Sequence, residues 1–530
     1  MTISTEDADL AHLACGMTAG SVRELLAVRA CNTPERPAFS SAGGGRELTY
    51  GALAALSGQW KAALRTARLP LEARIGLWID EPLDFIGTYL SCLAAGVTVV
   101  PFNPDAPVED VERNARRLRL DLVATDRPER LKSGTVWHIQ AGRPQIAVGP
   151  GRGPTSNHAG HRASVLLLTS GTTGDPKIVP LPEWHLLHRA QLVAAHHRLG
   201  AADRGYSSLP LFHVNAQVVA VLATLVAGST LVTERRFHRT GFWDRMAADR
   251  ITWINAVPAI LAILAGGPRP DPATADRVRF ARSASAPLSE AVLERFEERC
   301  GVRVLETYGM TEAAGQITAN PLDPEHRRPG SAGLPVGIQL RVVDKDGRPV
   351  AVGARGLVEI RGAGVIDHYL VHSEPSNESI ELRIPALNRG GWLPTGDLGH
   401  LDHDGYVFLS GRSDDVINCG GEKVYPREVE DLLRTDARVA DAVLVGQADP
   451  VLGQCPVAVV ARVEDTEPAL LASDLIEMCV SRLSRAKRPR RLIVVDHLPT
   501  GSMGKVSRRL VERQLTSSSV GLLETHALVS

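Results

Sequence analysis

The sequence predicts an α/β protein: a large N-terminal domain of α/β sheets plus a β-rich subdomain, then a small C-terminal domain. Its 530 residues suffice for roughly three to four domain-sized units. From residue 51 to about 310, apolar stripes at helical spacing alternate with short apolar runs, which is typical of parallel sheets covered by helices. After about 330, short strands separated by Asp-Gly turns take over, and from about 412 the alternation returns.

The N-terminal half begins with residues 1–20, which lack a pattern and are expected to form a loose terminus. A helix is predicted over 51–67 because four apolar side chains share one of its faces: Leu53, Leu56, Trp60 and Leu64. The apolar stretch 214–232 contains polar side chains and is predicted to be a buried helix leading into a strand, not a membrane span. Further buried strands are predicted over 73–80, 97–102, 120–126 and 164–171.

Capping and turn residues mark the later elements. Ser289 is a predicted helix N-cap and Gly301 a predicted helix stop. Residues 143–160 are rich in Gly and Pro and predict a flexible loop, and the tail 513–530 is expected to be loose. Strands of the β-rich subdomain are predicted within 337–350, 356–362 and 405–412. A C-terminal helix is predicted from the stripe Leu475, Ile476, Cys479, Val480 and Leu483.

Composition excludes several function classes. The 59 basic and 60 acidic residues give a net charge of -1, which argues against binding nucleic acid or an anionic membrane through bulk charge. The seven cysteines are dispersed without a C-x-x-C pair, so we expect a reducing, cytoplasmic location and no cysteine-based zinc site. The polar start MTISTEDADL predicts no signal peptide there. Only seven basic residues are lysine, so each lysine in a glycine-rich loop is a candidate for a specific role.

The first chemical motif follows a predicted buried strand. The segment LLTSGTTGDPK (167–177) is rich in Ser, Thr and Gly and ends in Lys177. Backbone N–H groups and hydroxyls of such a loop can converge on phosphate oxygens, and the lysine adds positive charge. The alternative is a polar surface turn, which is uncommon at this length directly after VLLL.

Four further segments carry chemistry that is weak in isolation. ETYGMTE (306–312) offers a tyrosine that can stack on a base, followed by Thr and Glu oxygens suited to Mg²⁺. WLPTGDLG (392–399) places Asp397 where it can hold ribose hydroxyls. LSGRSDDVINCGGEKV (409–424) and LPTGSMGKVSRR (498–509) are glycine-containing loops, and the second carries a lone Lys505. Each of them alone is also compatible with an ordinary turn.

In this order and spacing, the five segments resemble the adenylate-forming superfamily of acyl-CoA synthetases, luciferases and peptide-synthetase adenylation domains. The resemblance covers roughly residues 20–512 and includes LPLFHV (209–214) and RSASAPL (282–288). With GGEKVYPREVE (420–430), the sequence is most similar to soluble acyl-CoA ligases of the small-acid or oxalate type. The resemblance implies a large N-terminal domain, 1–411, and a small mobile α+β C-terminal domain, 412–530, with a hinge at Asp414.

The resemblance also implies an ATP site. The loop 169–177 holds the β- and γ-phosphates, Tyr308 stacks on adenine, and Asp397 with Arg412 holds the ribose. Glu312 is the implied Mg²⁺ ligand. The full implied ATP and AMP set is Thr169, Ser170, Gly171, Thr172, Thr173, Gly174, Lys177, Ala284, Ser285, Ala286, Tyr308, Gly309, Thr311, Asp397 and Arg412.

The remaining implied roles concern the acid, catalysis and coenzyme A. Lys505 contacts the carboxylate and the α-phosphate during adenylation, and Gly420, Gly421 and Lys423 serve coenzyme A after the small domain rotates. His213 gates the acyl pocket, although a satisfied core histidine is the alternative from the residue alone. The implied catalytic set is Lys505, Thr311, Glu312 and His213. The implied acyl-pocket set is His213, Asn215, Ala216, Val257, Ala313 and Ala314.

The resulting functional hypothesis is an ATP-dependent carboxylate–CoA ligase of bacterial secondary metabolism, which works through an acyl-AMP intermediate and releases AMP and pyrophosphate. Its partners are a small carboxylic acid, ATP with Mg²⁺, and coenzyme A. One alternative is an adenylating enzyme with a carrier-protein thiol or amine acceptor, or one specialised for a single half-reaction. Another is a non-catalytic nucleotide-binding descendant, against which the full set of charged motif residues argues. The polar stretch 370–391 after His368-Tyr369 departs from the family pattern and is expected to form an extra loop.

Overall fold

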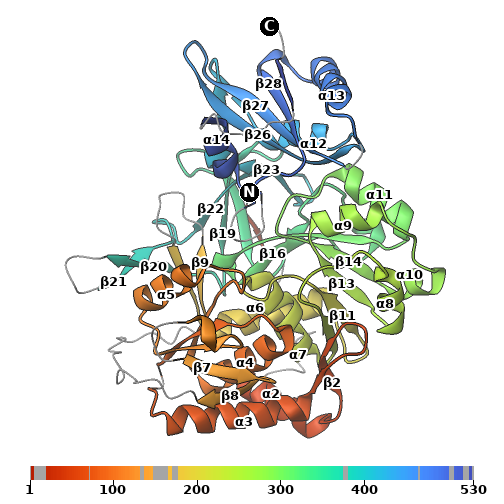
Figure 1. The fold of residues 1–530 in the computed structure, drawn as a ribbon. Coiled ribbons are helices and arrows are strands. Elements are labelled where there is room, and N and C mark those ends of the chain that lie inside the picture. The colour runs from red at the N-terminus through yellow and green to blue at the C-terminus, as the bar shows by residue number, and fades with distance from the viewer. Residues whose placement is uncertain are drawn as a thin grey trace.

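The computed structural model describes residues 2–4, 20–70, 72–131, 136–146, 165–169, 177–373, 380–463, 466–500, 506–516 and 524–527. These ranges form four β-sheets with helices packed on them. In Figure 1 the larger part of the molecule lies below, and a smaller unit made of the last quarter of the chain sits above it. This mixed α/β architecture confirms the predicted fold class.

The first nine-stranded sheet has a parallel centre. Strand β4 pairs in parallel with β5 and β6, and β9 pairs antiparallel with β10 at the other side. All five residues of β4 are buried, as expected for a strand covered on both faces. In order across the sheet, the strands are β21 (Ile380–Pro385), β20 (His368–Ser373), β10 (Lys177–Leu181), β9 (Val165–Thr169), β5 (Thr98–Pro101), β4 (Arg74–Trp78), β6 (Leu122–Thr125), β7 (Val136–Gln140) and β8 (Arg143–Ile146).

The second nine-stranded sheet is parallel from β2 to β15, except for the edge strand β3, and antiparallel from β15 onward. Its strands in order are β17 (Leu334–Pro335), β16 (Gly315–Ala319), β15 (Val304–Met310), β14 (Phe280–Ser283), β13 (Trp253–Ala256), β11 (Arg204–Ser207), β12 (Thr230–Thr233), β2 (Pro37–Ser41) and β3 (Glu47–Thr49). The carboxyl ends of its parallel strands therefore meet at one edge, where loops can gather functional residues.

Helices cover both large sheets. The main core cluster joins Ile75 of β4 to Leu187 of α6 and Val219 of η2, so α6 and η2 belong to the same buried layer. The helices are α2 (Val22–Asn32), α3 (Tyr50–Thr66), α4 (Pro82–Ala95), α5 (Val108–Arg117), α6 (Glu183–His196), the π-helix η2 (Asn215–Leu222), α7 (Ala223–Ala227), α8 (Phe242–Ala248), α9 (Pro258–Ala265), α10 (Pro272–Arg277) and α11 (Glu290–Cys300). Short 3₁₀ turns are η1 (Pro128–Arg130), η3 (Thr311–Ala313) and η4 (Pro324–His326).

Two smaller sheets complete the fold. A five-stranded antiparallel sheet contains β1 (Thr2–Ser4), β18 (Gln339–Val343), β19 (Gly356–Arg361), β22 (Leu393–Leu401) and β23 (Val407–Arg412). The C-terminal sheet contains β25 (Glu422–Val424), β24 (Ile417–Cys419), β26 (Val439–Asp449), β27 (Gly453–Arg462), β28 (Arg491–Val495) and β29 (Glu524–Ala527). It is flanked by η5 (Ser413–Asp415), α12 (Pro426–Leu433), α13 (Pro468–Arg482), η6 (Arg485–Lys487) and α14 (Arg508–Thr516).

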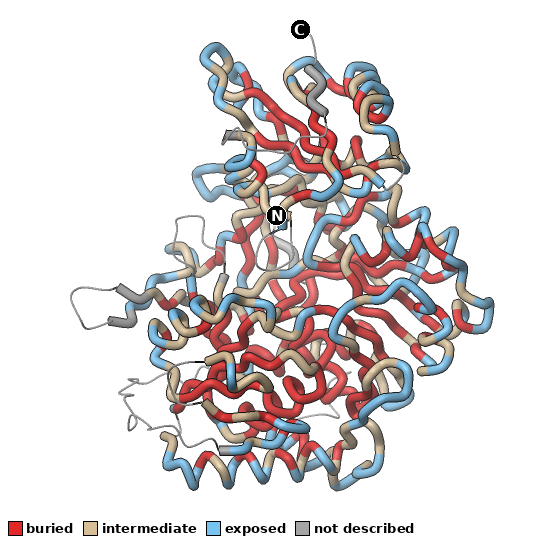
Figure 2. Tube along the Cα trace, viewed as in Figure 1, coloured by how far each residue is buried: buried red, intermediate tan, exposed pale blue. Residues whose placement is uncertain are grey.

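Several local predictions are confirmed. The predicted helix 51–67 is α3, and its four stripe residues are buried, as the buried strands and helix faces in Figure 2 illustrate. Ser289 caps α11 by accepting from the Val292 N–H at 3.3 Å, and Gly301 ends it in the left-handed region at φ 67°. The stretch 214–232 is a buried helix followed by β12. No helix among the described residues has the length and apolar character needed to cross a membrane.

Three expectations about loose segments were wrong where the structure describes them. Thr2–Ser4 forms β1 and pairs antiparallel with β18. The tail forms α14 and β29, and β29 pairs antiparallel with β28. The polar stretch after Tyr369, expected to form an extra loop, contains the strands β20 and β21, which pair as a hairpin and extend the first large sheet beyond β10. The strands β1, β29 and β21 each lie at the edge of a sheet, and edge pairing supplies hydrogen bonds that a local apolar pattern does not reveal.

Candidate functional site

The side chains of Tyr308, Asp397 and Arg412 meet where β15 passes the five-stranded sheet. The Tyr308 hydroxyl donates to Oδ2 of Asp397 at 2.5 Å, and Arg412 Nη1 donates to Oδ1 at 3.3 Å. Asp397 and Arg412 are direct cross-strand partners of β22 and β23. Gly396 has φ 77°, and a Cβ there would lie 2.7 Å from Nη2 of Arg412, so the glycine leaves room for the guanidinium. Residues from three different strands, β15, β22 and β23, thus hold a tyrosine, a carboxylate and a cation together.

The charges of this cluster are paired with one another, although Tyr308 and Asp397 are half-buried and Arg412 is exposed. Burial raises the pKa of Asp397, while Arg412 and the Tyr308 hydroxyl oppose that rise. Burial and the adjacent Asp397 raise the pKa of Tyr308 well above its ordinary value. The phenol therefore stays a neutral donor, and the carboxylate keeps its charge through its partners.

Glu312 forms a second carboxylate site, which is half-buried. The Tyr369 hydroxyl, from β20, donates to Oε1 of Glu312 at 3.1 Å, and Lys177 Nζ lies 4.7 Å from the centre of the Tyr369 ring. Burial raises the pKa of Glu312, whereas Tyr369, Arg412 and Lys177 act to lower it. Arg412 thus acts electrostatically on both Glu312 and Asp397, which brings the two predicted sub-sites into one place.

The two described ends of the glycine-rich loop lie beside this site. Thr169, the last residue of β9, is the cross-strand partner of Lys177, the first residue of β10. Lys177 in turn reaches Tyr369 and Glu312. The other predicted members of the loop, Ser170, Gly171, Thr172, Thr173 and Gly174, lie outside the described residues. Lys505 lies outside them as well.

A buried arginine supports the turn that carries Thr311 and Glu312. Arg189 of α6 is fully buried and donates from Nε to the Ala313 carbonyl at 3.2 Å and from Nη1 to the Val336 carbonyl at 2.8 Å. The turn ends at Ala314, which lies in the left-handed region at φ 55°. Sequence reasoning missed Arg189. The available signal was an arginine among the apolar residues of a helix face.

The loop after β14 contains the predicted adenine residues. Ala284 is buried, Ser285 and Ala286 are exposed, and Ser285 has φ 72°. Asn215 Nδ2 donates to Ser285 Oγ at 3.1 Å, so the loop is tied to the start of η2. The structure brings none of Ala284, Ser285 and Ala286 into a hydrogen bond with Tyr308 among the described contacts, and their role in adenine binding stays a prediction.

The predicted acyl-pocket residues gather around η2 and η3 but differ in exposure. His213 is half-buried, with its ring centre 4.2 Å from that of Phe212. Val257 and Asn215 are also half-buried. Ala216, Ala313 and Ala314 are fully buried, each in a different core cluster. Their assignment to an acyl pocket stays a prediction.

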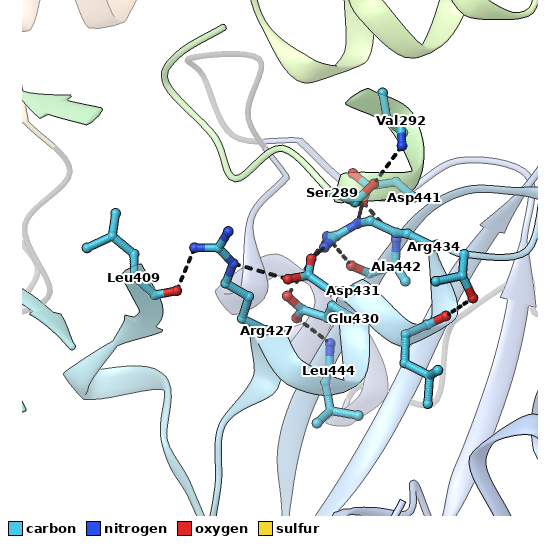
Figure 3. Close-up of polar contacts among 12 residues, drawn as sticks. Ser289, Val292, Leu409, Arg427, Glu430, Asp431, Arg434, Asp441, Ala442 and Leu444 are labelled. Atoms are coloured by element: carbon cyan, nitrogen blue, oxygen red, sulfur yellow. Dashed lines mark hydrogen bonds and ion pairs between the residues drawn. The ribbon is translucent and has the colours of Figure 1, made fainter. Parts of the chain in front are cut away.

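Figure 3 shows polar contacts that tie α12 to its surroundings. Arg427 Nη1 donates to the Leu409 carbonyl of β23 at 2.8 Å, which links the C-terminal sheet to the five-stranded sheet. Asp414, the predicted hinge, lies between them in η5. Next to it, Asp415 forms an ion pair with Arg508 at 3.0 Å. These are the contacts that a rotation about η5 would have to break or carry along.

The predicted CoA-binding residues belong to the C-terminal sheet. Gly420 and Gly421 form the turn between β24 and β25 with φ of 59° and 87°, and Lys423 is exposed on β25. Among the described residues, none of the hydrogen bonds or ion pairs joins these three to Glu312 or Asp397. Their role in binding coenzyme A stays a prediction.

Sequence reasoning also missed a cavity of about 450 Å³. Its lining comes from loops that follow β4, β5, β11 and β12, at the carboxyl ends of parallel strands in both large sheets. The cationic side chains in its lining are already paired: Arg235 with Asp80 and Asp105, and Arg236 with Asp105. The LPLFHV segment (209–214) contributes Leu209 to Phe212, but no motif marks the rest of the lining, because the packing of two sheets brings those residues together.

Comparison with known proteins places this geometry in a family. A family model described as AMP-binding enzyme matches residues 26–370, and one described as AMP-binding enzyme C-terminal domain matches residues 428–505. Sulfoacetate–CoA ligase of Cupriavidus necator is 35% identical over 503 residues, covering 91% of this chain and 96% of that protein.

Two solved structures share the fold. The crystal structure of ATP-bound MatB from Rhodopseudomonas palustris is 25% identical, with a TM-score of 0.81 over 94% of this chain and 100% of that one. O-succinylbenzoate coenzyme A synthetase (MenE) of Bacillus subtilis, in complex with ATP and magnesium ion, is 25% identical, with a TM-score of 0.76 over 93% of this chain and 99% of that one. The chain therefore belongs to the AMP-binding enzyme family and is an acid–thiol ligase of the adenylate-forming superfamily.

Proposed function

We propose that this enzyme is an ATP-dependent carboxylate–CoA ligase that forms an acyl-AMP intermediate and releases AMP and pyrophosphate. One observation carries the proposal: the Arg412 guanidinium acts on two half-buried carboxylates, Glu312 and Asp397, and Lys177 also acts on Glu312. A site for a nucleotide needs an acceptor for the ribose hydroxyls, cationic side chains near the phosphates and a ligand for the metal. All three must lie within the length of one nucleotide. This cluster supplies all three.

At the nucleotide end, Asp397 accepts the ribose hydroxyls and Tyr308 covers the adenine. Lys177 and Arg412 bring positive charge toward the phosphates. Magnesium enters as part of the MgATP substrate. Among the described residues, no group of three or more His, Cys, Asp or Glu could hold a metal ion. A lone carboxylate such as Glu312 fits Mg²⁺, since this ion is usually bound by one or two carboxylates together with substrate phosphates.

The chain's own residues then prepare the acid for attack on the α-phosphate. A carboxylate is a poor electrophile, and joining it to AMP gives it a good leaving group. Negative charge builds on the α-phosphate in the transition state, where fixed cations and N–H donors are most effective. We assign Lys505 to this contact because a compact ammonium reaches both the carboxylate and the phosphate. Thr311 and His213 border the reacting carboxylate in this assignment.

For the second half-reaction we propose that residues 412–530 rotate against residues 1–411 about Asp414. This movement withdraws Lys505 and presents Gly420, Gly421 and Lys423 to coenzyme A. The place of Asp414 in η5, between the five-stranded sheet and the C-terminal sheet, supports this rotation. The six described cysteines form no disulfide, which accords with the reducing cytoplasm proposed as the enzyme's location.

The proposal is tested with the purified full-length protein, MgATP and a library of acids. We expect acid-dependent pyrophosphate release, and a mass-detected acyl-CoA when coenzyme A is present. Lys505→Ala and Lys505→Arg should both abolish most adenylation while sparing thioester formation from supplied acyl-AMP. Pyrophosphate release without any acyl-CoA would redirect the proposal to a carrier-protein or amine acceptor. Absence of pyrophosphate release with every acid would overturn it.

A further inference from the structure

Arg282 is a buried cation that is held only by neutral groups. It lies on β14 and is 2% exposed. Its Nη1 donates to Oδ1 of Asn215 and to Oδ1 of Asn255, both at 3.0 Å, and its Nε donates to Oε1 of Gln316 at 3.3 Å. Within the described ranges, no carboxylate forms an ion pair with this guanidinium, and burial alone shifts its pKa, to about 9.

The buried charge of Arg282 is only partly compensated by its hydrogen bonds. Removing a charged group from water is costly, and amide oxygens compensate only part of that cost when no opposite charge is present. A second group in the cluster is incomplete as well. Gln316 is 1% exposed, its Oε1 is fixed by Arg282, and its Nε2 has no hydrogen-bond partner among the described residues. A cation and an unsatisfied N–H donor side by side are the requirements of an anion site.

A second buried arginine differs from Arg282 in the kind of acceptor that holds its guanidinium. Arg189 is also fully buried and also lacks an ionic partner within the described ranges. Its acceptors, however, are two backbone carbonyls, which tie α6 to the turn at Ala313 and to Val336. Backbone carbonyls are part of the fold, so these two bonds make Arg189 a structural support, although its own Nη2 has no hydrogen-bond partner among the described residues. The acceptors around Arg282 are instead side-chain amides, and one of these amides, that of Gln316, has an unpartnered Nε2.

The Arg282 cluster is connected to the proposed reaction site through one side chain. Asn215 is half-buried, accepts from Arg282 with Oδ1 and donates with Nδ2 to Ser285 at 3.1 Å. Ser285 is exposed in the loop assigned to AMP. Asn215 also begins the π-helix η2, and π-helical segments frequently mark functional sites. One asparagine side chain, which belongs to the predicted acyl-pocket set, therefore separates the buried cation from the loop assigned to adenine.

We propose that Arg282, with Gln316 and Asn215, binds a second anionic group on the acid, so that the enzyme selects short carboxylic acids carrying a further carboxylate or sulfonate. This inference rests on the proposed ligase function. A guanidinium offers paired N–H donors that match both carboxylate and sulfonate oxygens. The bound anion neutralises the buried charge and gives the Gln316 amide its acceptor. Because only the Asn215 side chain lies between Arg282 and Ser285, the acid must be short.

The first experiment compares acids that differ only in the second charge. With wild-type protein, MgATP and coenzyme A, kcat/KM is measured for malonate against malonamate and for sulfoacetate against methylsulfonylacetate. We expect each dianion to exceed its partner by on the order of 10²-fold or more, because a site built for a charged group rejects the analogue lacking it. The partner acids are monoanions whose second group is uncharged, and they are called neutral below for that second group. Comparing the two pairs shows whether the site prefers carboxylate or sulfonate. Equal values within both pairs would overturn the inference.

The second experiment assigns the preference to the cluster. Arg282→Gln should bring the dianion-to-neutral ratio of kcat/KM close to one, and Arg282→Lys should restore part of it. Gln316→Leu, which keeps the cation, should lower the ratio about tenfold. This variant tests the anion site if Arg282→Gln does not fold. Arg189→Lys is the matched control and should leave the ratio at its wild-type value. A ratio that survives both Arg282→Lys and Gln316→Leu unchanged would overturn the assignment.

These outcomes separate the inference from the function on which it rests. If no acid of either kind supports pyrophosphate release, the ligase proposal fails. If the neutral acids are used as well as the dianions, the ligase proposal stands and the anion site is wrong. Binding of ATP measured by calorimetry, in wild type and variants, shows that a changed ratio does not come from a damaged nucleotide site.

Discussion

The proposed nucleotide end and the proposed acid end of the site differ in whether their charged side chains have a partner of opposite charge. At the nucleotide end, Asp397 is bonded to Arg412, and Glu312 lies under the influence of Lys177 and Arg412. At the acid end, Arg282 has only amide oxygens as acceptors within the described structure. The first end is neutralised before any ligand arrives, and the second is not.

The difference reflects what each end has to recognise. ATP is the same molecule in every turnover, and charges that are already paired and fixed avoid reorganisation when it binds. The acid is the variable substrate, and an unpaired cation makes its binding depend on a charge that the acid must bring. Changes at the nucleotide end should therefore affect all acids alike, whereas changes at the acid end should affect acids by class. The predictions below test that contrast, from the largest expected effect to the smallest.

The largest effect is expected for Glu312→Gln. Loss of one preorganised charge beside the phosphates should lower acid-dependent pyrophosphate release by about 10²–10³-fold. The factor should be the same for dianionic and neutral acids, because Glu312 serves only the nucleotide end. The check is a set of initial rates across the acid library.

Tyr369→Phe is the control for Glu312. It removes the 3.1 Å hydrogen bond but keeps the carboxylate and the ring under Lys177, so its effect should be far smaller. A Glu312→Gln variant that discriminates between acid classes would break the contrast between the two ends.

Arg189→Met should act on stability without acting on selectivity. It leaves the Ala313 and Val336 carbonyls without their buried donor, and we expect the free energy of unfolding to fall by about 2–4 kcal/mol. Turnover should fall for all acids in the same proportion, because the turn carrying Glu312 loses its support. Denaturant unfolding and the acid-pair ratio measure the two consequences. A selective loss of dianion use would assign Arg189 to the acid end.

Tyr308→Phe is expected to be milder. The variant keeps the ring for stacking and loses the 2.5 Å hydrogen bond to Asp397. A hydrogen bond to a charged group contributes about 1.5–3 kcal/mol, so the KM for ATP should rise roughly tenfold or more while kcat changes little. Steady-state kinetics at saturating acid provide the measurement. A fall in kcat with unchanged KM would mean that the hydroxyl acts in the chemical step instead.

The elements that could be predicted from the sequence are those whose signals are local. The caps Ser289 and Gly301 act within one helix, and the stripe Leu53 to Leu64 repeats at helical spacing. The prediction of the caps and that of the stripe are therefore both confirmed. The segments holding Tyr308 and Asp397 were identified through a family resemblance. Their 89-residue separation gives no local signal that they touch.

Arg189 and Arg282 could not be predicted, because arginine in a helix or strand is ordinarily at the surface. Whether such a side chain is buried depends on which elements pack over it, and that is decided by tertiary structure. The edge strand β1 was missed for a related reason. Three polar residues acquire a strand conformation only through pairing with β18.

The smallest expected effect concerns Glu306, a carboxyl on β15 that lacks the cationic partners of its neighbours. It is 7% exposed, accepts from the Gly330 N–H at 3.2 Å and forms no ion pair in the described part of the chain. Burial raises its pKa from the usual 4.5 to about 8. The folded protein therefore binds this proton more tightly than the unfolded chain does. The associated stability is fully present below pH 4.5 and is lost as the pH rises through about 8.

Glu306→Gln keeps the shape and the acceptor oxygen but removes the titration. Melting temperatures from pH 5 to 9 at constant ionic strength should fall more steeply for wild type than for the variant, and the two curves should diverge most above pH 7. The divergence would show that a buried carboxyl on the nucleotide strand is destabilising when ionised unless a cation is paired with it, as Arg412 is with Asp397. Parallel curves would mean that Arg327 and Arg427, which act to lower this pKa, already compensate the charge at a distance. The paired character of the nucleotide end would then extend along the whole of β15.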